Sequence, residues 1–428
     1  MSREMKHSGI AWIGEIPKSW SISKVKDAFV RKNQKAHQEN PVVLSLARSG
    51  VRVRDISTNE GQVAESYYDY NPVEIDDLLI NPMDLYSGAN CSISKVSGVI
   101  SPAYVNLRHK ENICPRFYDY YFKTQYWAMA FFAHGKGISF DNRWTLGIDI
   151  LLNYYIPSPS YAEQLLIADF LDKKCGEIDE LVALQEKIIE ELKSYKQSVI
   201  TETVCKGLNP NVPMKDSGVE WIGEIPEGWN VMRLKNILSS PLQYGANESG
   251  GAYNPNLPRY VRITDILDNK LRENIDKQSL TEEQASGYIL KHNDILFARS
   301  GGTVGKSFIF REEYGRCAFA GYLIRAQLKQ DFIADFVFYY TQSHSYDEWK
   351  NQIFIQATIQ NIGADRYSEL LIPIPRVSEQ QEIADYLDKK CLEIDQLITI
   401  KQQKIVELKE YKKSLIYEYT TGKKCVEA

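Results

Sequence analysis

The pattern of apolar and polar positions divides the chain into two kinds of segment that alternate twice. In residues 21–159 and 230–377, short runs of β-branched and aromatic residues are interrupted by Gly and Asn, which predicts short strands with a few short helices. In the segment after each, apolar residues recur three and four apart among many charged residues, which predicts a long amphipathic helix. We therefore expect a fold of the α/β (α+β) class with long helices.

The first long helix is expected from Tyr161 to about Thr203, a length of roughly 65 Å at 1.5 Å per residue. Its apolar positions fit the heptad seam of a coiled coil: Ile178, Leu181, Gln185, Ile188, Leu192, Tyr195 and Val199. The second helix keeps this pattern at Ile394, Leu397, Leu408, Tyr411 and Leu415, with Lys401 at the place of Gln185. S-x-x-E/Q sequences at Ser160–Glu163 and Ser378–Gln381 predict a capping box at the start of both helices.

An internal repeat shows that the chain is built from two copies of one plan. Lys6–Trp20 (KHSGIAWIGEIPKSW) matches Lys215–Trp229 (KDSGVEWIGEIPEGW) at an offset of 209 residues. Ile167–Ile178 (IADFLDKKCGEI) matches Ile383–Ile394 (IADYLDKKCLEI) at an offset of 216. The stretches between these frames share only short islands, such as VRVRDIS and VRITDIL. A repeated frame around diverged stretches indicates one task carried out on two different targets.

The short connection after the first helix constrains the arrangement of the two halves. Only about a dozen residues separate that helix from the second copy of the repeat at Lys215–Trp229, so at 3.3–3.6 Å per residue the second domain must begin near the far end of the helix. If the second helix returns antiparallel along the first, a pseudo-two-fold axis relates the halves, and a two-helix coiled coil separates two domains. We expect domains at 1–159 and 208–377, and spacer helices at 160–207 and 378–425.

Composition excludes several classes of protein. The chain has 428 residues, of which 43% are apolar, as in ordered globular proteins. It has no apolar run long enough for a membrane span, and its start lacks the apolar core of a signal peptide, so we expect a cytoplasmic protein. Its seven cysteines are scattered without a C-x-x-C pair, which argues against a disulfide framework and a zinc site.

Motifs for catalysis are missing from the sequence. SGGTVGKS at Ser300–Ser307 resembles a phosphate loop, but its glycine spacing does not fit G-x-x-x-x-G-K-[ST]. We expect a glycine turn between strands there, in contact with a DNA backbone if with any ligand. The sequence contains no H-E-x-x-H spacing, no G-x-S-x-G elbow and no N/D-P-P-Y/F box of adenine methyltransferases. We therefore expect no catalytic residues and no cofactor in this chain.

Two features could contact nucleic acid. The tryptophans of the WIGEIP motifs could stack on bases, although their fixed places in both copies favour packing: Trp12, Trp20, Trp221 and Trp229. A basic strip follows the first motif, and its candidates for phosphate contact are Lys24, Lys26 and Lys32. The second copy keeps two such candidates, Arg233 and Lys235. The net charge of −5 does not argue against DNA, because the acidic excess falls on the first long helix. The near-neutral domains suggest that a partner supplies part of the electrostatic attraction.

The ordered combination of motifs resembles the specificity subunit of type I restriction-modification systems. It consists of the WIGEIP start, an R-x-T-D-I island, an S-E-Q-Q-x-I-A-x-(F/Y)-L-D exit and a complete two-fold repeat. The resemblance covers the whole chain and is closest at Ser8–Trp20, Ser217–Trp229, Glu163–Ile178 and Ser378–Ile394.

The resemblance implies a division of labour between this chain and its partners. Each variable stretch would be a target recognition domain for one half of a split sequence in double-stranded DNA, and the helices would set the gap. Two methyltransferase subunits carrying S-adenosylmethionine would bind the helices, and two motor-nuclease subunits using ATP and Mg would join the full complex. The specificity subunit itself would catalyse nothing.

Direct readout of base edges needs polar side chains on loops, and for each candidate a capped turn or an ordinary surface position is the alternative. In the first domain the candidates are Arg48, Ser49, Arg52, Arg54, Ser87, Asn90, Asn142 and Arg143. In the second domain they are Gln243, Tyr244, Arg262, Thr264, Ser300, Thr303, Lys306, Gln356, Thr358, Gln360 and Asn361.

Two other functions remain open from the residues alone. The chain could be a scaffold that joins two copies of a partner protein through its helices and touches no DNA. Salt-sensitive binding to duplex DNA distinguishes the two functions, because phosphate contacts weaken as salt rises. The chain could also be a self-contained nuclease or methyltransferase with an unfamiliar site, which activity of the purified chain alone would reveal.

Overall fold

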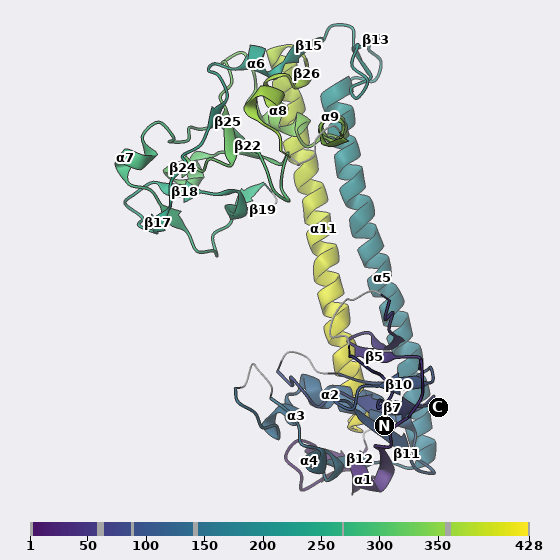
Figure 1. Ribbon diagram of the computed structural model, residues 1–428. Helices are drawn as coiled ribbons and strands as arrows, with labels where there is room; N and C mark the ends of the chain where they lie inside the picture. Colours follow the sequence, from purple (N-terminus) through teal and green to yellow (C-terminus); the bar gives the residue numbers. More distant parts are fainter. Residues whose placement is uncertain are drawn as a thin grey trace. The chain divides into compact units, whose positions relative to one another are not determined.

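The computed structural model (Figure 1) divides the chain into two compact units. Unit 1 comprises Met1–Gln185 and Gln403–Ala428, and unit 2 comprises Glu186–Gln402. Each unit contains one globular domain and one segment from each of two long helices, α5 (Tyr161–Lys206) and α11 (Val377–Thr420). The structure describes residues 3–57, 64–86, 90–139, 144–267, 269–355 and 361–426.

The domain of unit 1 is built around a four-stranded antiparallel sheet in the order β4-β11-β8-β9. Helix α2 lies against β9 and buries its aromatic face in the main core of the unit. The elements of this domain are β1 (Met5–His7), β2 (Glu15–Pro17), β3 (Ser21–Lys24), α1 (Val25–Ala28), β4 (Phe29–Lys32), β5 (Leu44–Ala47), β6 (Gly50–Val53), β7 (Asn71–Val73), β8 (Leu78–Ile80), β9 (Cys91–Ile93), β10 (Gly98–Ile100), β11 (Val105–His109), α2 (Pro115–Trp127), α3 (Ala130–Ala133), α4 (Ile148–Leu152) and β12 (Tyr155–Ser158).

The domain of unit 2 contains a similar antiparallel sheet, β16-β25-β22-β23, and a second sheet, β17-β21-β18-β24, whose strands β18 and β24 are parallel. Its elements are β13 (Met214–Asp216), β14 (Glu224–Pro226), β15 (Asn230–Arg233), α6 (Leu234–Ile237), β16 (Gln243–Tyr244), β17 (Gly251–Ala252), β18 (Arg259–Val261), η1 (Ile263–Asp265), β19 (Ile266–Leu267), β20 (Lys270–Leu271), β21 (Gln278–Ser279), α7 (Glu282–Ala285), β22 (Ile295–Ala298), β23 (Ser307–Ile309), η2 (Glu312–Tyr314), β24 (Cys317–Phe319), β25 (Leu323–Ala326), α8 (Ala334–Tyr340), α9 (His344–Ile355), α10 (Ala364–Ser368) and β26 (Leu371–Ile374).

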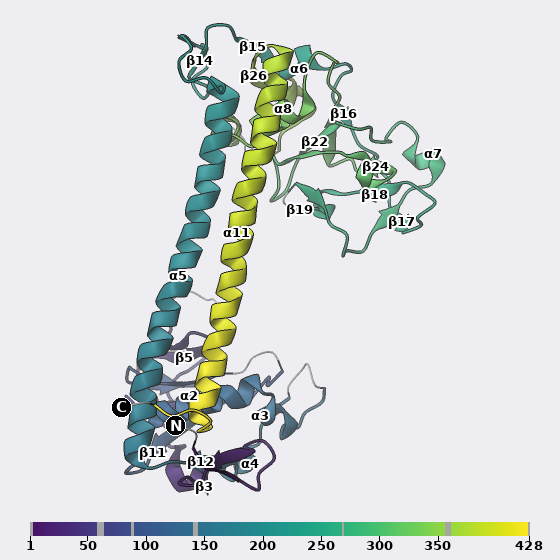
Figure 2. The same cartoon turned by 180° about the vertical axis from the view of Figure 1, so that it is seen from behind.

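The repeated sequence motifs form the same frame in both units. Each WIGEIP motif belongs to a hairpin, β1–β2 or β13–β14. The strand after it pairs antiparallel with the strand just before the long helix, as β3 with β12 and β15 with β26 (Figure 2). Trp20 is 1% exposed and Trp229 is 2% exposed, so neither ring can stack on a base. The packing role predicted for these two tryptophans is confirmed.

One buried glutamine ties the first turn of each long helix to its domain. In unit 1 the Gln164 amide accepts a hydrogen bond from the Cys114 backbone N–H at 2.8 Å and donates one to the Pro159 carbonyl at 2.9 Å. In unit 2 the Gln380 amide accepts from the Ile333 N–H and donates to the Pro375 carbonyl, at 2.9 and 3.0 Å. The two copies therefore fasten helix to domain with the same contacts.

The predicted capping boxes are only half right. Ser160 caps α5, because its Oγ accepts the Glu163 N–H at 3.3 Å. The Glu163 carboxylate does not reach back to the cap and instead accepts a hydrogen bond from the Trp20 indole N–H at 2.9 Å. The capping box at Ser378 is wrong, because α11 already begins at Val377 and Ser378 lies inside its first turn.

The two long helices run antiparallel within each unit. In unit 1 the Phe170 ring lies 4.4 Å from the Tyr419 ring, and further along α5 the Asp179 carboxylate lies 2.7 Å from the Lys412 ammonium. In unit 2 the Lys196 ammonium lies 2.7 Å from the Asp395 carboxylate. The two ion pairs are equivalent in the repeat, because Asp395 and Lys412 lie 216 residues after Asp179 and Lys196. Each pair joins the aspartate of one helix to the lysine of the other. The predicted antiparallel pairing is confirmed inside each unit.

The predicted heptad seam is right at some positions and wrong at others. Ile178, Ile394 and Leu415 are buried, and Gln185, Ile188, Leu192, Val199 and Leu408 are half-buried. Leu181 and Leu397 are each 46% exposed, and Tyr195 and Tyr411 are also exposed, so these four predicted seam residues do not face the partner helix. The inward positions in α5 are Ile178, Val182, Gln185 and Ile189, with the matching positions in α11. Steps of three and four residues fit either stripe once they start from Ile178, and only burial distinguishes them.

Replacing a seam residue and its exposed neighbour should separate the two registers. We expect Ile394→Ala to lower the free energy of unfolding by about 2–4 kcal/mol, because it opens a cavity in a buried seam. Leu397→Ala, on the same helix, should change it by less than about 0.5 kcal/mol. Urea denaturation followed by circular dichroism measures both, and equal losses would show that the corrected register is wrong.

Candidate nucleic-acid interface

A two-residue turn presents the first group of candidates in unit 1. Arg48 and Ser49 form the turn between β5 and β6, and both side chains are exposed. Arg52 lies on β6 and is also exposed; its Nε donates to Ser45 Oγ at 3.4 Å. The Asn90 amide donates hydrogen bonds to the Ala47 and Arg48 carbonyls at 3.0 and 3.3 Å. The structure thus brings Arg48, Ser49, Arg52 and Asn90 together, with Asn90 holding the turn in place.

The other candidates of the first domain have different outcomes. Arg54 follows β6, and its backbone N–H donates to the Val43 carbonyl at 2.8 Å. Six candidates from the two domains lie outside the described residues: Ser87, Asn142 and Arg143 in the first domain, and Gln356, Thr358 and Gln360 in the second.

The lysines of the predicted basic strip have three different environments. The Lys24 ammonium lies 5.2 Å above the Tyr155 ring, and the exposed Lys26 donates to the Asn153 side chain at 2.8 Å. Lys32 is directed into the domain, where its ammonium lies 3.0 Å from the fully buried carboxylate of Asp77. Lys32 therefore neutralises a buried charge, and an ammonium engaged with this carboxylate is poorly placed to bind a phosphate.

Neighbouring carboxylates complete this ion-pair group. Glu74 pairs with Lys32 and with Arg108, and the Lys32 ammonium holds the pKa of the Glu74 carboxyl below its usual value. Arg108 lies 3.2 Å from Asp77 as well. Two cations and two carboxylates thus compensate one another, which is the arrangement of a structural ion-pair network.

The basic pair of the second copy shares one exposed partner. Arg233 Nε lies 2.8 Å from the Glu369 carboxylate, and Lys235 contacts the same group. Lys235 lowers the pKa of the Glu369 carboxyl through this hydrogen bond. Both cations remain on the surface, where an ion pair is weak, so a phosphate could compete with Glu369 for them.

The island shared by the two variable stretches has a structural use in unit 2. The Arg262 guanidinium makes hydrogen bonds to both oxygens of the buried Asp265 carboxylate and to the Asp276 carbonyl. Its donors are therefore already engaged. Thr264 is exposed beside this pair, and its hydroxyl donates to Asp265 at 3.4 Å.

Residues 299–306 form a hairpin loop between β22 and β23, as predicted for the glycine turn. Gly301 has a φ of +80° and open space around its Cα, so a glycine suits this tip. Thr303 and the exposed Lys306 lie on the same loop. Ser300 pairs through its backbone with Asn361, which places two further candidates at the base of the loop.

Strand β16 presents Tyr244 beside this loop. The exposed Tyr244 hydroxyl accepts a hydrogen bond from the Ala364 N–H at 2.9 Å. The ring lies 5.0 Å from the guanidinium carbon of Arg299. Gln243 is engaged in the sheet, where it donates to the Gly287 carbonyl and accepts from Arg325. Tyr244, Ser300 and Asn361 thus come together, whereas Gln243 stabilises the domain.

Two residues of this surface were missed by the sequence analysis. One is Arg299, which lies directly before Ser300. The other is Tyr322, which is 64% exposed at a turn and whose backbone carbonyl accepts the Arg299 N–H at 2.9 Å. The signal for Arg299 was its place between a buried strand and a glycine-rich turn. No sequence signal marked Tyr322, because its turn joins the neighbouring strands β24 and β25 and only the tertiary structure brings that turn to Arg299.

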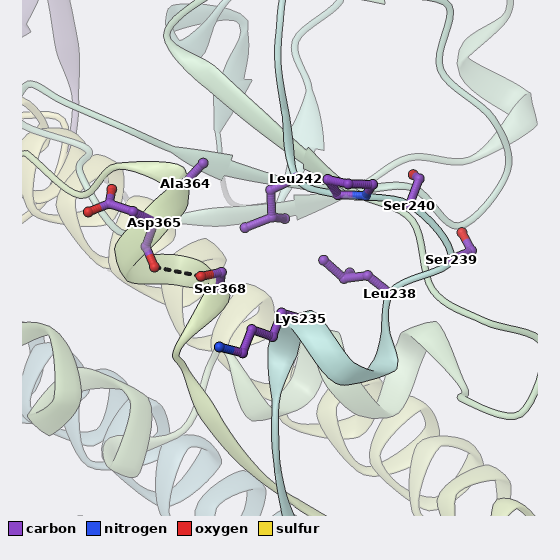
Figure 3. Close-up of a pocket in the computed structure, with 9 residues that line it drawn as sticks. Lys235, Leu238, Ser239, Ser240, Leu242, Ala364, Asp365 and Ser368 are labelled. Atoms are coloured by element: carbon purple, nitrogen blue, oxygen red, sulfur yellow. Dashed lines mark hydrogen bonds between the residues drawn. The ribbon is translucent and has the colours of Figure 1, made fainter.

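A cavity of about 450 Å³ adjoins Tyr244 on the other side of Ala364. Figure 3 shows Lys235, Leu238 and Leu242 on one side of it and Asp365 and Ser368 of α10 on the other. The Ser368 hydroxyl donates to the Asp365 carbonyl, so it serves the helix end. In the described part of the chain, no group of three or more His, Cys, Asp or Glu side chains could hold a metal ion.

Comparison with known proteins places these surfaces in a family context. The family described as type I restriction modification DNA specificity domain matches residues 226–410. The chain is 25% identical over 370 residues to the type I restriction enzyme MjaVIII specificity subunit of Methanocaldococcus jannaschii, covering 81% of this chain and 80% of that protein. It is 24% identical over 407 residues to the EcoBI specificity subunit of Escherichia coli, covering 89% and 81%.

Solved structures share the fold. One is described as the structural basis of complex assembly and conformational transition of the type I R-M system; its TM-score is 0.72 at 15% identity, covering 95% of this chain and 98% of that one. The HsdS subunit from Thermoanaerobacter tengcongensis gives a TM-score of 0.53 at 14% identity with the same coverage. The expected fold class is confirmed. None of the helices within the described residues is long and apolar enough to cross a membrane.

The environment of Lys32 predicts a stability effect. Lys32→Met should lower the free energy of unfolding by about 1–3 kcal/mol, because the buried Asp77 carboxylate loses its closest cation while Arg108 remains. Lys26→Met, a surface change on the same strip, should alter it by less than about 0.5 kcal/mol. Urea denaturation of both variants is the measurement. A stable Lys32→Met protein with weakened DNA binding would instead support the phosphate role.

Proposed function

We propose that this chain is a specificity subunit of a type I restriction-modification system and that each of its two units reads one half of a bipartite DNA target. The observation that carries the proposal is a single frame, present twice, that holds two different recognition surfaces. Unit 1 presents the Arg48–Ser49 turn, whereas unit 2 presents the 299–306 loop beside Tyr244. Different surfaces on one frame are what two unlike half-sites require.

The recognition surfaces divide into base contacts and phosphate contacts. We assign direct readout to polar side chains on turns or beside them, which are the exposed Arg48, Ser49 and Arg52 in unit 1 and the half-buried Ser300 and Thr303 with the exposed Asn361 in unit 2. Lys306, Lys26 and the Arg233–Lys235 pair are assigned to phosphates, because they are exposed cations on the same domains. Arg262 and Lys32 support the structure around these surfaces, since their charged groups already bind buried carboxylates.

The partners of the chain are DNA and the other subunits of a type I complex. In our proposal two methyltransferase subunits bind it and supply S-adenosylmethionine, and two motor-nuclease subunits join them with ATP and Mg. The chain itself is the non-catalytic member. Its recognition domains occupy 1–159 and 208–377, and its spacer helices occupy 160–207 and 378–425.

Exposed aliphatic side chains on the long helices suit the methyltransferase subunits. In unit 2, α11 exposes Leu392, Leu397 and Ile400, each by more than two fifths. In unit 1, α5 exposes Leu181 and Leu184. Because these residues lie outside the seam between the helices, they are available to bury apolar surface against another protein. A partner bound there would also supply positive charge that the near-neutral domains lack.

The helices are proposed to set the gap between the half-sites. α5 has 46 residues and α11 has 44, and each contributes one segment to unit 1 and one to unit 2. The ion pairs Asp179–Lys412 and Lys196–Asp395 hold the register between the helices. A spacer with a fixed register gives a fixed distance, which in DNA corresponds to a fixed number of base pairs.

Selection from a random duplex pool tests the function. The chain is co-purified with its partner methyltransferase, bound duplexes are sequenced, and a split motif with a constant gap is expected. Replacing residues 21–159 by the same segment of another family member should change one half of the motif only. An unchanged motif, or a change in both halves, would refute the assignment of one half to each unit. A stable complex that enriches no sequence, and whose binding does not weaken with salt, would support the scaffold function instead.

Lengthening both helices tests their role as a spacer. We propose to insert seven residues after Ile189 in α5 and after Ile405 in α11, which keeps the heptad in phase. The insertion adds about 10 Å of helix, and we expect the preferred gap to grow by roughly three base pairs. The same selection measures the gap. Seven residues inserted at the exposed linker residue Asn209 serve as the control and should leave it unchanged; an unaltered gap in both variants would contradict the role.

A further inference from the structure

Arg299 is held firmly at the edge of the recognition surface of unit 2. It follows the last residue of β22 and opens the hairpin loop. Its backbone N–H donates to the Tyr322 carbonyl at 2.9 Å, and its carbonyl accepts the Ile362 N–H at 2.9 Å. The backbone N–H and the carbonyl of Arg299 are thus both held by distant segments, so the position of its Cα is well defined.

The guanidinium of Arg299 is positioned by an aromatic ring rather than by a carboxylate. Its central carbon lies 5.0 Å from the centre of the Tyr244 ring, a distance typical of a cation–π contact. The ring cannot easily turn away, because its hydroxyl accepts the Ala364 N–H at 2.9 Å. A planar group stacked on a fixed ring loses little further conformational freedom on binding a ligand.

The Arg299 guanidinium makes no hydrogen bond within the part of the chain that the structure describes. Its Nε is enclosed without an acceptor, whereas its terminal nitrogens are not enclosed. Among the described residues of unit 2, five arginines are buried or half-buried, and Arg299 alone has neither an ion pair nor a side-chain hydrogen bond. The other four are Arg259, Arg262, Arg311 and Arg325, each of which pairs with a carboxylate.

An unsatisfied, partly enclosed guanidinium points to a ligand. Its enclosed Nε–H has no acceptor among the described residues, which is unfavourable, and its terminal donors remain open to a ligand. The neighbouring Gly301 and Gly302 have open space where a side chain would be, so a large surface can approach closely. A rigid fork of two donors matches the O6 and N7 acceptors of guanine in the major groove. A phosphate needs no such planarity, and the exposed Lys306 on the same loop suits it better.

We propose that Arg299 reads a guanine in the half-site bound by unit 2, and that Tyr244 positions its guanidinium. This inference rests on the proposed function and adds one specificity-determining residue and one positioning residue to it. Ser300 and Asn361 flank Arg299 and limit the position of the base pair that it meets.

The test repeats the duplex selection with variants of the full chain in complex with its methyltransferase. The wild-type motif and the exchange of residues 21–159 first identify which half belongs to unit 2. Arg299→Ala should then lose a guanine at one position of that half, with discrimination there falling about 10- to 100-fold. The other half of the motif should be unchanged, and it serves as an internal control for folding and assembly.

Further variants separate the fork from the charge. Arg299→Lys keeps the positive charge but not the two parallel donors, so it should lose the same guanine while the salt dependence of binding stays as in the wild type. Tyr244→Leu should weaken that preference in part, whereas Tyr244→Phe, which keeps the ring, should retain most of it. Arg316→Ala is the matched control, because Arg316 is exposed and paired with Glu282, and it should leave the motif intact.

Three outcomes would overturn the inference and leave the proposed function standing. An intact unit 2 half-site in Arg299→Ala would remove Arg299 from base recognition. A uniform loss of affinity with an unchanged motif would make it a phosphate contact. Loss of a base in the other half-site would contradict its assignment to unit 2. Absence of any motif with the wild-type complex would instead refute the proposed function, and the inference with it.

Discussion

A buried glutamine at the start of each long helix is the contact on which the rest of each unit depends. Gln164 and Gln380 each bind one carbonyl just before their helix and one backbone N–H at the start of a helix in the domain. Each amide is nearly inaccessible to water, so loss of either hydrogen bond would leave a buried polar group unpaired. This contact fixes the direction in which a domain leaves its helix. Any recognition surface on that domain inherits its orientation from it.

Competition from carboxylates decides which cations can act on DNA. Lys32 and Arg262 are both cations, but Asp77 and Asp265 already bind them at buried positions. Breaking such a pair would leave a buried negative charge without a partner, and that cost exceeds what a single phosphate contact returns. Among the described residues Arg299 has no carboxylate partner, and its guanidinium lies against the Tyr244 ring. Availability of donors, more than their number, thus distinguishes a recognition surface from a structural one.

The duplicated frame explains how one chain can serve two different targets. The paired strands β3–β12 and β15–β26, the buried tryptophans and the glutamine contacts recur in both units. Between them the units diverge: unit 2 has a second sheet with a parallel pair, β18–β24, and unit 1 has the β5–β6 hairpin. Because the frame bears the stability, the inserted parts are free to change. The helix residues Asp179, Lys196, Asp395 and Lys412 repeat as well, which maintains the same pairing of the helices in each unit.

The sequence by itself determined the duplication, the class of fold and the extent of both long helices, because these follow from repeats and periodicity that are local along the chain. It also placed the glycine turn at 300–307 between two strands. It could not choose the stripe of the heptad seam, since Leu181 and Val182 both continue a pattern of threes and fours from Ile178, and only contact with the other helix buries one of them. Nor could it separate Arg262 from Arg299. Asp265, the partner of Arg262, lies three residues after it in the sequence. Arg299 is instead contacted by Tyr244, Tyr322 and Ile362, which come from distant segments, and only the tertiary structure brings these residues together.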